Sequence, residues 1–314
     1  MEMITINISD NMKKIFIFPI LALLSLVPSV MGAEIGDINN DGSVDIADVV
    51  YLFKHRNVPL DDGDLNCDNS VDIADVVYLF KNYDKFREPV IFAKNLKLEP
   101  HRDEGYCYIE DADGNKFIAL KEGITAPNIP DAKIIKIPLK SVVCGDQILL
   151  GTAYITKDEN ITNSVNTMQY LRYTAPKWKN ELPTLYKRYQ NGEILDAGTW
   201  GNPKYDNIIN ASPDMVFIHK IKRTEPMVAK LDELGITYSR TGAYTEDSFL
   251  GKIEWIKFFA VFYGVNDYKK VNNYFQETWK SRNNVIRKVR NINTYPKVAC
   301  FYWSSSKGPY VWGA

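Results

Sequence analysis

Two short acidic stretches of the chain carry oxygen-bearing residues at the same spacing. Each has side-chain oxygens at positions 1, 3, 5, 9 and 12 of a loop, and a serine at position 7 whose backbone carbonyl can also bind. Calcium is a hard cation that takes about six to eight oxygen ligands, and this is the spacing of a calcium loop. We therefore expect two calcium ions. The predicted ligands are Asp37, Asn39, Asp41, Ser43, Asp45 and Asp48 in the first loop, and Asp64, Asn66, Asp68, Ser70, Asp72 and Asp75 in the second.

The residues between the ligands fit the same interpretation. Gly42 at position 6 allows the sharp turn, and Asn69 tolerates the same left-handed geometry in the second loop. Position 12 is Asp instead of the usual Glu, so its carboxylate reaches less far. A solvated acidic turn is the alternative, but two complete loops in one register argue against it.

Each loop runs directly into a predicted helix, and no helix precedes either loop. The sequence SVDIADVVYLFK at Ser43–Lys54 is repeated letter for letter at Ser70–Lys81, after a connector that contains Pro59. Apolar residues recur at helical spacing in both copies and predict one apolar face on each helix. That predicted face comprises Ile46, Val49, Val50 and Phe53 in the first copy, and Ile73, Val76, Val77 and Phe80 in the second.

This pair of loop-helix repeats resembles a type I dockerin, a small all-α module with EF-hand-like loops, over residues 36–84. The resemblance implies a cohesin module as partner, with either half able to face it. Ile46 and Ala47 at loop positions 10 and 11 replace the hydroxyl pair of clostridial type I dockerins, which leaves the identity of the cohesin open. A module this small has little core, so calcium should supply much of its folding free energy. The expected partner face is Ile46, Ala47, Phe53, Lys54, Ile73, Ala74, Phe80 and Lys81.

Composition and the N-terminus indicate an exported protein of a few modules. The formal net charge of −1 argues against a nucleic-acid binder. Lys13 and Lys14 precede a short apolar run and small residues up to Ala33, which predicts a secretory signal peptide at residues 1–33, with Met12 as an alternative start. We therefore expect an extracellular or cell-surface location. The four cysteines show no metal-binding spacing; disulfides and free thiols both remain open.

The middle of the chain predicts strands. Residues 96–128 alternate in the manner of a β-hairpin around Asp111–Asn115, which we interpret as a turn and not as a third calcium loop. Residues 129–265 alternate between strand and helix, which predicts an α/β lobe with a largely parallel sheet. Its predicted strands are Ile134–Pro138, Glu193–Asp196, Met215–His219 and Ile236–Tyr238. Ligands of such sheets bind beyond the carboxyl ends of the strands.

Two helices close the lobe. Ser248–Tyr263 is apolar nearly all round and is expected to be buried, whereas Asn266–Arg290 is long and amphipathic. A further strand is expected at Lys297–Tyr302. The expected organisation is a signal peptide (1–33), a dockerin (34–84), a linker (85–95), a hairpin element (96–128), an α/β lobe (129–265), a linker helix (266–291) and the start of a second lobe (292–314).

Ser212–Phe217, Glu233–Ile236 and Glu254–Phe258, followed by the long helix, are similar in order and spacing to iron-complex and vitamin B12 solute-binding proteins of ABC importers. The resemblance runs from about residue 129 to the end. It implies two α/β lobes joined by a rigid helix and an importer permease as partner. No catalytic residues are expected, because the sequence has no Gly-x-Ser-x-Gly motif, no P-loop and no acidic pair at a predicted strand end. The family would bind a chelated metal such as a ferric siderophore, heme or cobalamin in the cleft between the lobes. Residues 292–314 would supply only the first strand of a truncated second lobe.

Aromatic and polar residues at the expected strand ends suit a large planar or chelated ligand. The candidate cleft residues are Ser141, Trp200, His219, Tyr244, Tyr302 and Trp303. A structural role for His219 and for any one of the aromatic residues is the alternative. Two other functions remain open: a dockerin-tethered enzyme of polysaccharide degradation, and a calcium-stabilised surface scaffold.

Overall fold

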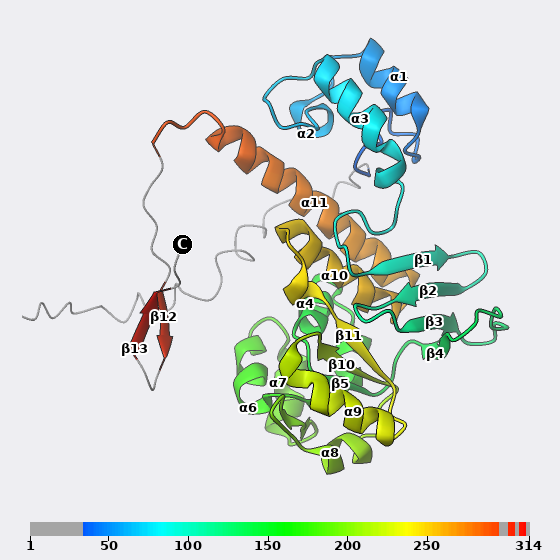
Figure 1. The fold of residues 1–314 in the computed structure, drawn as a ribbon, viewed down its shortest axis with the longest axis vertical. Coiled ribbons are helices and arrows are strands. Elements are labelled where there is room, and N and C mark those ends of the chain that lie inside the picture. Colours follow the sequence, from blue (N-terminus) through cyan, green and yellow to red (C-terminus); the bar gives the residue numbers. More distant parts are fainter. Residues whose placement is uncertain (1–33, 295–300, 305–307, 312–314) are drawn as a thin grey trace, which may run out of the picture. The chain divides into compact units, whose positions relative to one another are not determined.

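The structure is a computed structural model that describes residues 34–294, 301–304 and 308–311 (Figure 1). The predicted signal peptide and Cys300 lie outside these ranges. Within them, every helix is too short or too polar to cross a bilayer.

The two repeats form a small helical unit, residues 34–86, which we call the repeat module. It contains α1 (Ile46–Lys54), α2 (Leu60–Gly63) and α3 (Ile73–Phe86). Asp45 caps the amino terminus of α1 and forms a reciprocal capping box with Asp48, and Asp72 and Asp75 repeat this arrangement in α3. The identical sequences therefore start their helices at equivalent residues.

The apolar face predicted for each helix is only partly the buried one. Val49 and Leu52 of α1 are buried and join the same core cluster as Val76 and Leu79 of α3. Ile46, Val50 and Phe53 of that face are exposed, as are their repeats in α3. The apolar residues cover more of the circumference than two short helices can bury against each other.

The segment predicted as a linker is firmly held. Two carboxylates of the α/β lobe accept hydrogen bonds from the backbone of Pro89–Asn95, which we call the strap. Glu254 accepts from the backbone N–H groups of Ile91, Phe92 and Ala93 at 2.7–2.8 Å. Glu246 accepts from those of Lys94 and Asn95 at 2.8 and 3.1 Å. The repeat module is thus joined to the lobe by a fixed connection.

A four-stranded sheet follows the strap, in the order β1-β2-β3-β4. The predicted hairpin forms between β2 and β3, antiparallel, with Glu110 opposite Lys116. The strand predicted to open the α/β lobe at Ile134 is instead β4, which pairs parallel to β3 and completes this sheet. The strands are β1 (Lys97–His101), β2 (Tyr106–Glu110), β3 (Lys116–Lys121) and β4 (Lys133–Ile137).

The turn of this hairpin connects the two sheets. Asp111 is buried and accepts hydrogen bonds from the hydroxyl of Ser239 and the backbone N–H of Arg240, besides those from its own turn. Its oxygens are therefore engaged in protein contacts, which favours the turn over a third calcium loop.

The α/β lobe is built on a five-stranded sheet in the order β11-β10-β5-β6-β7, with every adjacent pair parallel. The predicted parallel sheet is confirmed, and the strand Met215–His219 has the predicted limits. The chain leaves β5 toward β6 on one side and later returns to β10 on the other, so the strand order reverses between β5 and β10. The strands are β5 (Val142–Cys144), β6 (Val165–Met168), β7 (Leu195–Asp196), β10 (Met215–His219) and β11 (Tyr238–Thr241).

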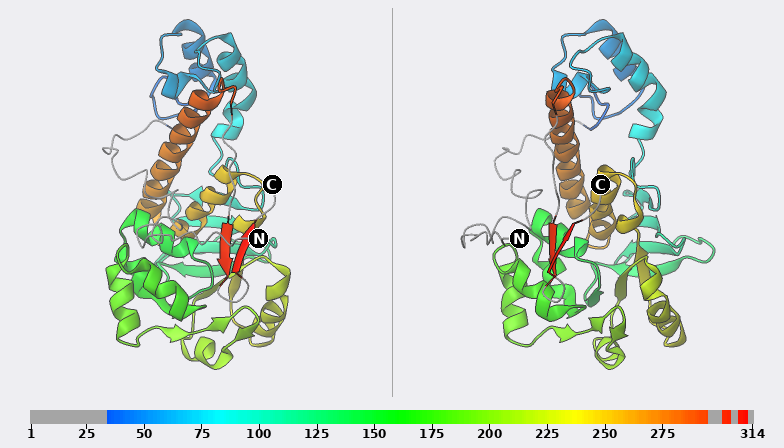
Figure 2. Two further views of the ribbon diagram at one scale, coloured as in Figure 1. Left: turned by 90° about the vertical axis from the view of Figure 1, so that its left-hand side faces the viewer. Right: turned by 60° about the vertical axis from the view of Figure 1, so that its left-hand side comes forward.

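Helices cover both faces of this sheet (Figures 1 and 2). On one face α4 and α10 pack against Phe217, whose ring centroid lies 5.0 Å from that of Phe259. On the other face α8 and α9 cover Val143 and Val216. The helices are α4 (Ile148–Thr156), α5 (Glu159–Ser164), α6 (Leu171–Thr174), α7 (Pro183–Gln190), α8 (Tyr205–Asn210), α9 (Glu225–Glu233) and α10 (Phe249–Val261). Short strands β8 (Gly198–Thr199) and β9 (Asn202–Pro203) and 3-10 turns at Ala175–Trp178, Lys222–Thr224 and Ala243–Thr245 connect these elements.

The predicted long helix is α11 (Val265–Val289), which packs on α10 and α4 and reaches α2 of the repeat module (Figure 2). Val271, Phe275 and Trp279 on its apolar side are buried, but Val285 is exposed. In the last turns the buried side chains are polar, and Arg287 is one of them. The helix is followed by a hairpin of β12 (Phe301–Ser304) and β13 (Gly308–Val311).

Candidate functional site

The reversal of strand order places a histidine-carboxylate pair at the carboxyl ends of β5 and β10. His219 Nδ1 lies 3.1 Å from Oδ2 of Asp146, and both side chains are buried. The hydroxyl of Thr241, at the end of β11, donates to the same oxygen of Asp146. The other Asp146 oxygen accepts from the backbone N–H of Ile148 at 2.9 Å. With Nδ1 donating to the carboxylate, Nε2 of His219 is the nitrogen left for a ligand.

A glycine makes this arrangement possible. The backbone N–H of Gly145 donates to the carbonyl of Phe217 at 3.0 Å. A Cβ at position 145 would lie 2.3 Å from that carbonyl oxygen, so only glycine fits without displacing the strand. Gly145 thereby brings Asp146 against the end of β10.

Aromatic rings surround the histidine. The ring centroids of Trp200 and Tyr244 lie 5.5 and 5.0 Å from that of His219, both nearly perpendicular to it. Tyr170 in turn meets Trp200 edge-on at 5.3 Å. Within the described structure, the indole N–H of Trp200 and Oε1 of the buried Gln169 have no hydrogen-bond partner. Aromatic faces with unused polar groups are typical of a small-molecule site.

The predicted cleft residues divide into three groups. Trp200, His219 and Tyr244 come together. The placement of Ser141 was wrong: it precedes β5 at the amino end of the sheet, where its hydroxyl donates to the carbonyl of Ala211 at 2.8 Å. Tyr302 and Trp303 lie in β12, opposite Tyr310 and Pro309, but their side chains are outside the described part of the structure.

Sequence reasoning missed four residues at this edge of the sheet: Asp146 and Thr241, which contact His219, and Gln169 and Tyr170, which lie next to one another after β6. A usable signal was present, because Gly145 and Asp146 directly follow the apolar run Val142–Cys144. A glycine and a polar residue after a buried parallel strand are typical of a ligand-binding edge.

The two acidic loops have matching hydrogen-bond patterns. In the first loop, Asp37 accepts from the backbone N–H groups of Asp41 and Gly42 at 3.1 Å. In the second, Asp64 accepts from those of Asp68 and Asn69 at 2.9 and 3.0 Å. These backbone donors turn the loop around its first carboxylate.

The last ligand position of each loop is also equivalent. Asp48 is buried and accepts from the backbone of Ile38, Asn39 and Asp45. Asp75 does the same with Leu65, Asn66 and Asp72. Each carboxylate has about four acceptor sites, so these contacts leave capacity for a cation.

Several carboxylates lie close together in each loop, and this proximity affects the pKa of one carboxylate in each. Burial raises the pKa of Asp37 above its usual value, and the nearby carboxylate of Asp48 adds to the rise. Burial likewise raises the pKa of Asp75, with a further contribution from Asp64. Oxygens of Asp64, Asp68 and Asp75 lie within 4.8 Å of one another, a donor set that fits a hard divalent cation.

The helices of the repeat module present two similar apolar faces. Ile46 and Phe53 of α1 are 50% and 55% exposed, and Ile73 and Phe80 of α3 are 49% and 58% exposed. The neighbouring residues of the expected partner face, Ala47, Lys54, Ala74 and Lys81, are exposed as well. Exposed apolar faces of this kind mark surfaces that other molecules cover.

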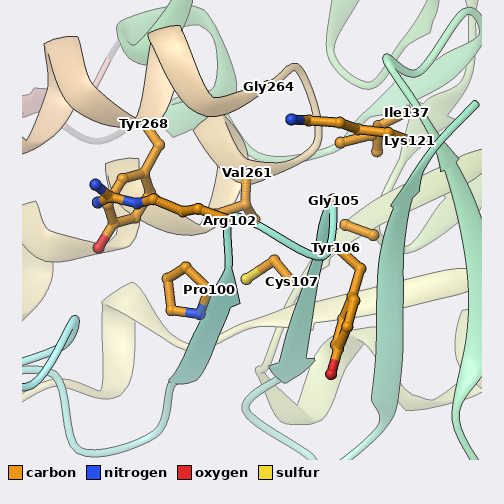
Figure 3. A pocket seen from close by; sticks show the side chains of 11 residues that line it. Pro100, Arg102, Gly105, Tyr106, Cys107, Lys121, Ile137, Val261, Gly264 and Tyr268 are labelled. Carbon is orange, nitrogen blue, oxygen red and sulfur yellow. The ribbon is translucent and has the colours of Figure 1, made fainter. Parts of the chain in front are cut away.

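A separate hollow lies between the four-stranded sheet and the junction of α10 and α11 (Figure 3). Its lining is mostly apolar and includes Cys107, whose thiol pKa burial raises to about 12. Arg102 and Tyr268 also line it. It is distinct from the His219 site and the loops, and none of the predicted site residues lines it.

The comparisons with known proteins give partial matches. The chain is 37% identical over 227 residues to the uncharacterized lipoprotein MJ0872 of Methanocaldococcus jannaschii, covering 71% of this chain and 56% of the relative. It is 29% identical over 241 residues to the uncharacterized lipoprotein MJ0878 of the same organism, covering 70% of this chain and 56% of that one. A third relative there, the uncharacterized protein MJ0642, is 34% identical over 178 residues, 56% of this chain and 51% of its own.

Among solved structures, the chain is similar to a TroA-like periplasmic binding protein, FepB of Veillonella parvula. The TM-score is 0.38 at 20% identity, over 50% of this chain and 46% of that one. No family model matches the chain. The chain spans about half the length of the curated relatives it matches.

Proposed function

We propose that this chain is an exported protein in which a calcium-binding, dockerin-like module is joined to an α/β lobe that binds a solute for an ABC importer. The observation that carries the first part is the matched pair of acidic loops, each built around its first and last carboxylates. The observation that carries the second is the pairing of His219 with Asp146 at the reversal of strand order.

Calcium would be held by the loop positions named above, Asp37 to Asp48 and Asp64 to Asp75. Bound calcium would neutralise the gathered carboxylates and fix the loops that precede α1 and α3. Titration of calcium into chelator-treated protein should increase far-UV helical signal and show two binding events by calorimetry. The double variant Asp41→Ala/Asp68→Ala should lose both responses, whereas Asp84→Ala, at an exposed position outside the loops, should keep them. Absence of calcium binding to the wild-type chain would refute this part.

A cohesin module is the proposed partner of the repeat module. The exposed residues of α1 and α3 support this, because both copies of the face are free for contact. Since either face could bind, Phe53→Ala or Phe80→Ala alone should weaken cohesin binding little, and the double variant should abolish it. Ile209→Ala, an exposed apolar residue on α8, is the control. Failure of a panel of cohesins to bind calcium-loaded protein would contradict the proposal.

The proposed solute is a chelated metal complex such as a ferric siderophore, heme or cobalamin. The aromatic rings of Trp200 and Tyr244 would contact a large planar ligand, and His219 would present Nε2 to it. Thermal-shift and absorbance titrations with these three ligand classes should identify one that binds. His219→Ala and Trp200→Ala should weaken that binding, and Ser141→Ala should not.

An enzyme tethered by the repeat module is the second candidate. A glycoside hydrolase needs two carboxylates beside the sugar. Within the described structure, Asp146 is paired with His219 and not with a second carboxylate, which favours a binding site over a hydrolytic one. A scaffold role is the third candidate, and it predicts no ligand at His219. If no ligand binds in the titrations and no polysaccharide is hydrolysed, the solute-binding and enzyme candidates both fail and the scaffold role is favoured.

Export is supported by the predicted signal peptide. It is also supported by two of the relatives, which are named lipoproteins. Fractionation of cells that express the chain should recover it outside the cytoplasm. Recovery in the cytoplasm alone would contradict export.

A further inference from the structure

The two loops have the same sequence pattern but different surroundings. The carboxyl-terminal turns of α11 lie against the second loop. Nη1 of Arg287 is 3.7 Å from Oδ2 of Asp64, and the two side chains are only 5% and 0% exposed. The carbonyl of Arg287 also accepts from Nδ2 of Asn69 at 3.2 Å.

Basic side chains of α11 and of its carboxyl-terminal cap contact both the second loop and α2. Arg290 donates to the carbonyl of Cys67, inside the second loop, at 2.6 Å. Arg287 also donates to the carbonyl of Leu60 at 3.0 Å and forms an ion pair with Asp61. Lys280 lies 2.7 Å from Asp62. The guanidinium of Arg287 is therefore fixed from several sides beside the second loop.

The first loop has no equivalent of this cation. Among the described residues, no lysine or arginine forms an ion pair with Asp37, Asp41, Asp45 or Asp48. Asp41 and Ser43 are exposed, whereas their counterparts Asp68 and Ser70 are partly buried. The first loop thus has no cation of the described chain against its carboxylates, and its Asp41 and Ser43 are open to solvent.

We propose that Arg287 is a resident positive charge that makes the second loop the weaker calcium site and the first loop the calcium-responsive one. The inference rests on the proposed binding of calcium by the loops. A divalent cation that enters the second loop meets a guanidinium that its other partners keep from moving away. Repulsion between like charges in a partly buried site lowers the affinity, and calcium loops tune their affinity through local charge.

The same contact explains how the second loop keeps its form without metal. Arg287 offsets the repulsion among Asp64, Asp68 and Asp75, whose oxygens remain within 4.8 Å of one another. The second half of the repeat module stays attached to α11 when calcium is withdrawn. The first half, whose loop has no described cation against its carboxylates, loses order.

The repeat supplies the experiment with its own control. Asp41→Ala removes a ligand of the first loop and leaves the second for measurement, and Asp68→Ala does the reverse. Calcium titration by calorimetry on the full chain should give a dissociation constant roughly tenfold larger for the second loop than for the first. Arg287→Met should lower the calcium dissociation constant of the second loop several-fold, toward that of the first loop. Lys288→Met removes the same charge from an exposed neighbouring position and should change neither loop.

Hydrogen exchange gives a readout that does not need calcium to bind. On chelation, the backbone amides of α1 should exchange faster while those of α3 stay protected, and Arg287→Met should remove that difference. Equal affinities of the two loops, or an Arg287→Met variant whose second loop binds no better, would overturn the inference. If neither loop binds calcium, the proposed function fails instead, so the two failures are distinguishable.

Discussion

Lys257 and Glu254 form a buried ion pair one turn apart on α10, with 2.9 Å between Nζ and Oε1. Nζ also donates to the carbonyl of Pro89 at 2.9 Å and lies 4.3 Å from the ring centroid of Phe275 on α11. Burial lowers the pKa of Lys257, and the carboxylate of Glu254 opposes that change. This pair therefore joins α10, the strap and α11 at one point.

Replacing Glu254 should lower the unfolding free energy more than replacing Lys257. Glu254→Ala removes the acceptor of three strap amides and leaves Lys257 buried without its counter-charge, so it should cost about 3–5 kcal/mol of unfolding free energy. Lys257→Met fills a similar volume and leaves Glu254 with its backbone donors, so it should cost less. Urea denaturation of both variants checks the order. A Lys257→Met variant that is the less stable of the two would contradict it.

Asp267, in the first turn of α11, should give the fold a measurable pH dependence. Burial, together with the neighbouring Asp158, raises the pKa of Asp267 to about 6, above its ordinary value of 3.8. The folded state therefore binds the proton more tightly, and its stability falls as pH rises from about 4 to 6. Asp267→Asn removes this effect, so the unfolding free energy of the variant should rise relative to that of the wild type between pH 4 and pH 7. Denaturation at both pH values checks it, with Glu122→Gln, an exposed carboxylate, as the control. A stability difference that is independent of pH would contradict the prediction.

The thiols of the described cysteines should be inert in the native protein. Cys67, Cys107 and Cys144 are free and buried, and burial raises the pKa of each thiol. Because the thiolate is the reactive species, Ellman's reagent at pH 8 should label a Cys300→Ser variant only after denaturation. Rapid labelling of the folded variant would show that one of these thiols is accessible.

Glycine should be required at position 145 and dispensable at position 151. Gly145→Ala places a methyl group 2.3 Å from the carbonyl oxygen of Phe217 and should cost about 1–3 kcal/mol. Gly151 lies in α4 with open space around its Cβ position. Gly151→Ala should therefore raise the unfolding free energy by up to about 1 kcal/mol. Thermal unfolding of the two variants tests this. Equal effects would mean that the β5–β10 junction tolerates a side chain.

The sequence was most informative where local signals agree. Met215–His219 is an apolar run between Asp214 and Lys220, and its limits were predicted without error. Gly264 ends one helix and precedes the next, so α11 was predicted to within a residue at each end. Trp200, His219 and Tyr244 were predicted because strand ends in an α/β pattern converge at one edge of the sheet.

The errors have a common physical origin in contacts between distant residues. Glu254 fixes Ile91 from far along the chain, and no local pattern in the predicted linker reveals that hydrogen bond. Ser141 lies at the opposite end of the sheet from the predicted one, because the strand beside it is β5, whose three residues are too few to predict, and not the preceding strand β4. Which apolar residues of α1 are buried depends on where α3 packs, and the composition of α1 alone does not reveal it.

The strap has a mechanical consequence. A slack tether would let an anchored repeat module and the α/β lobe diffuse independently. Here, a pull on the module would be resisted by two sets of contacts. One is the hydrogen bonds of Glu246 and Glu254 to the strap, and the other is the contacts of Arg287 and Arg290 with the module. A pull on the module would therefore have to break the hydrogen bonds of the two glutamates before the strap could extend.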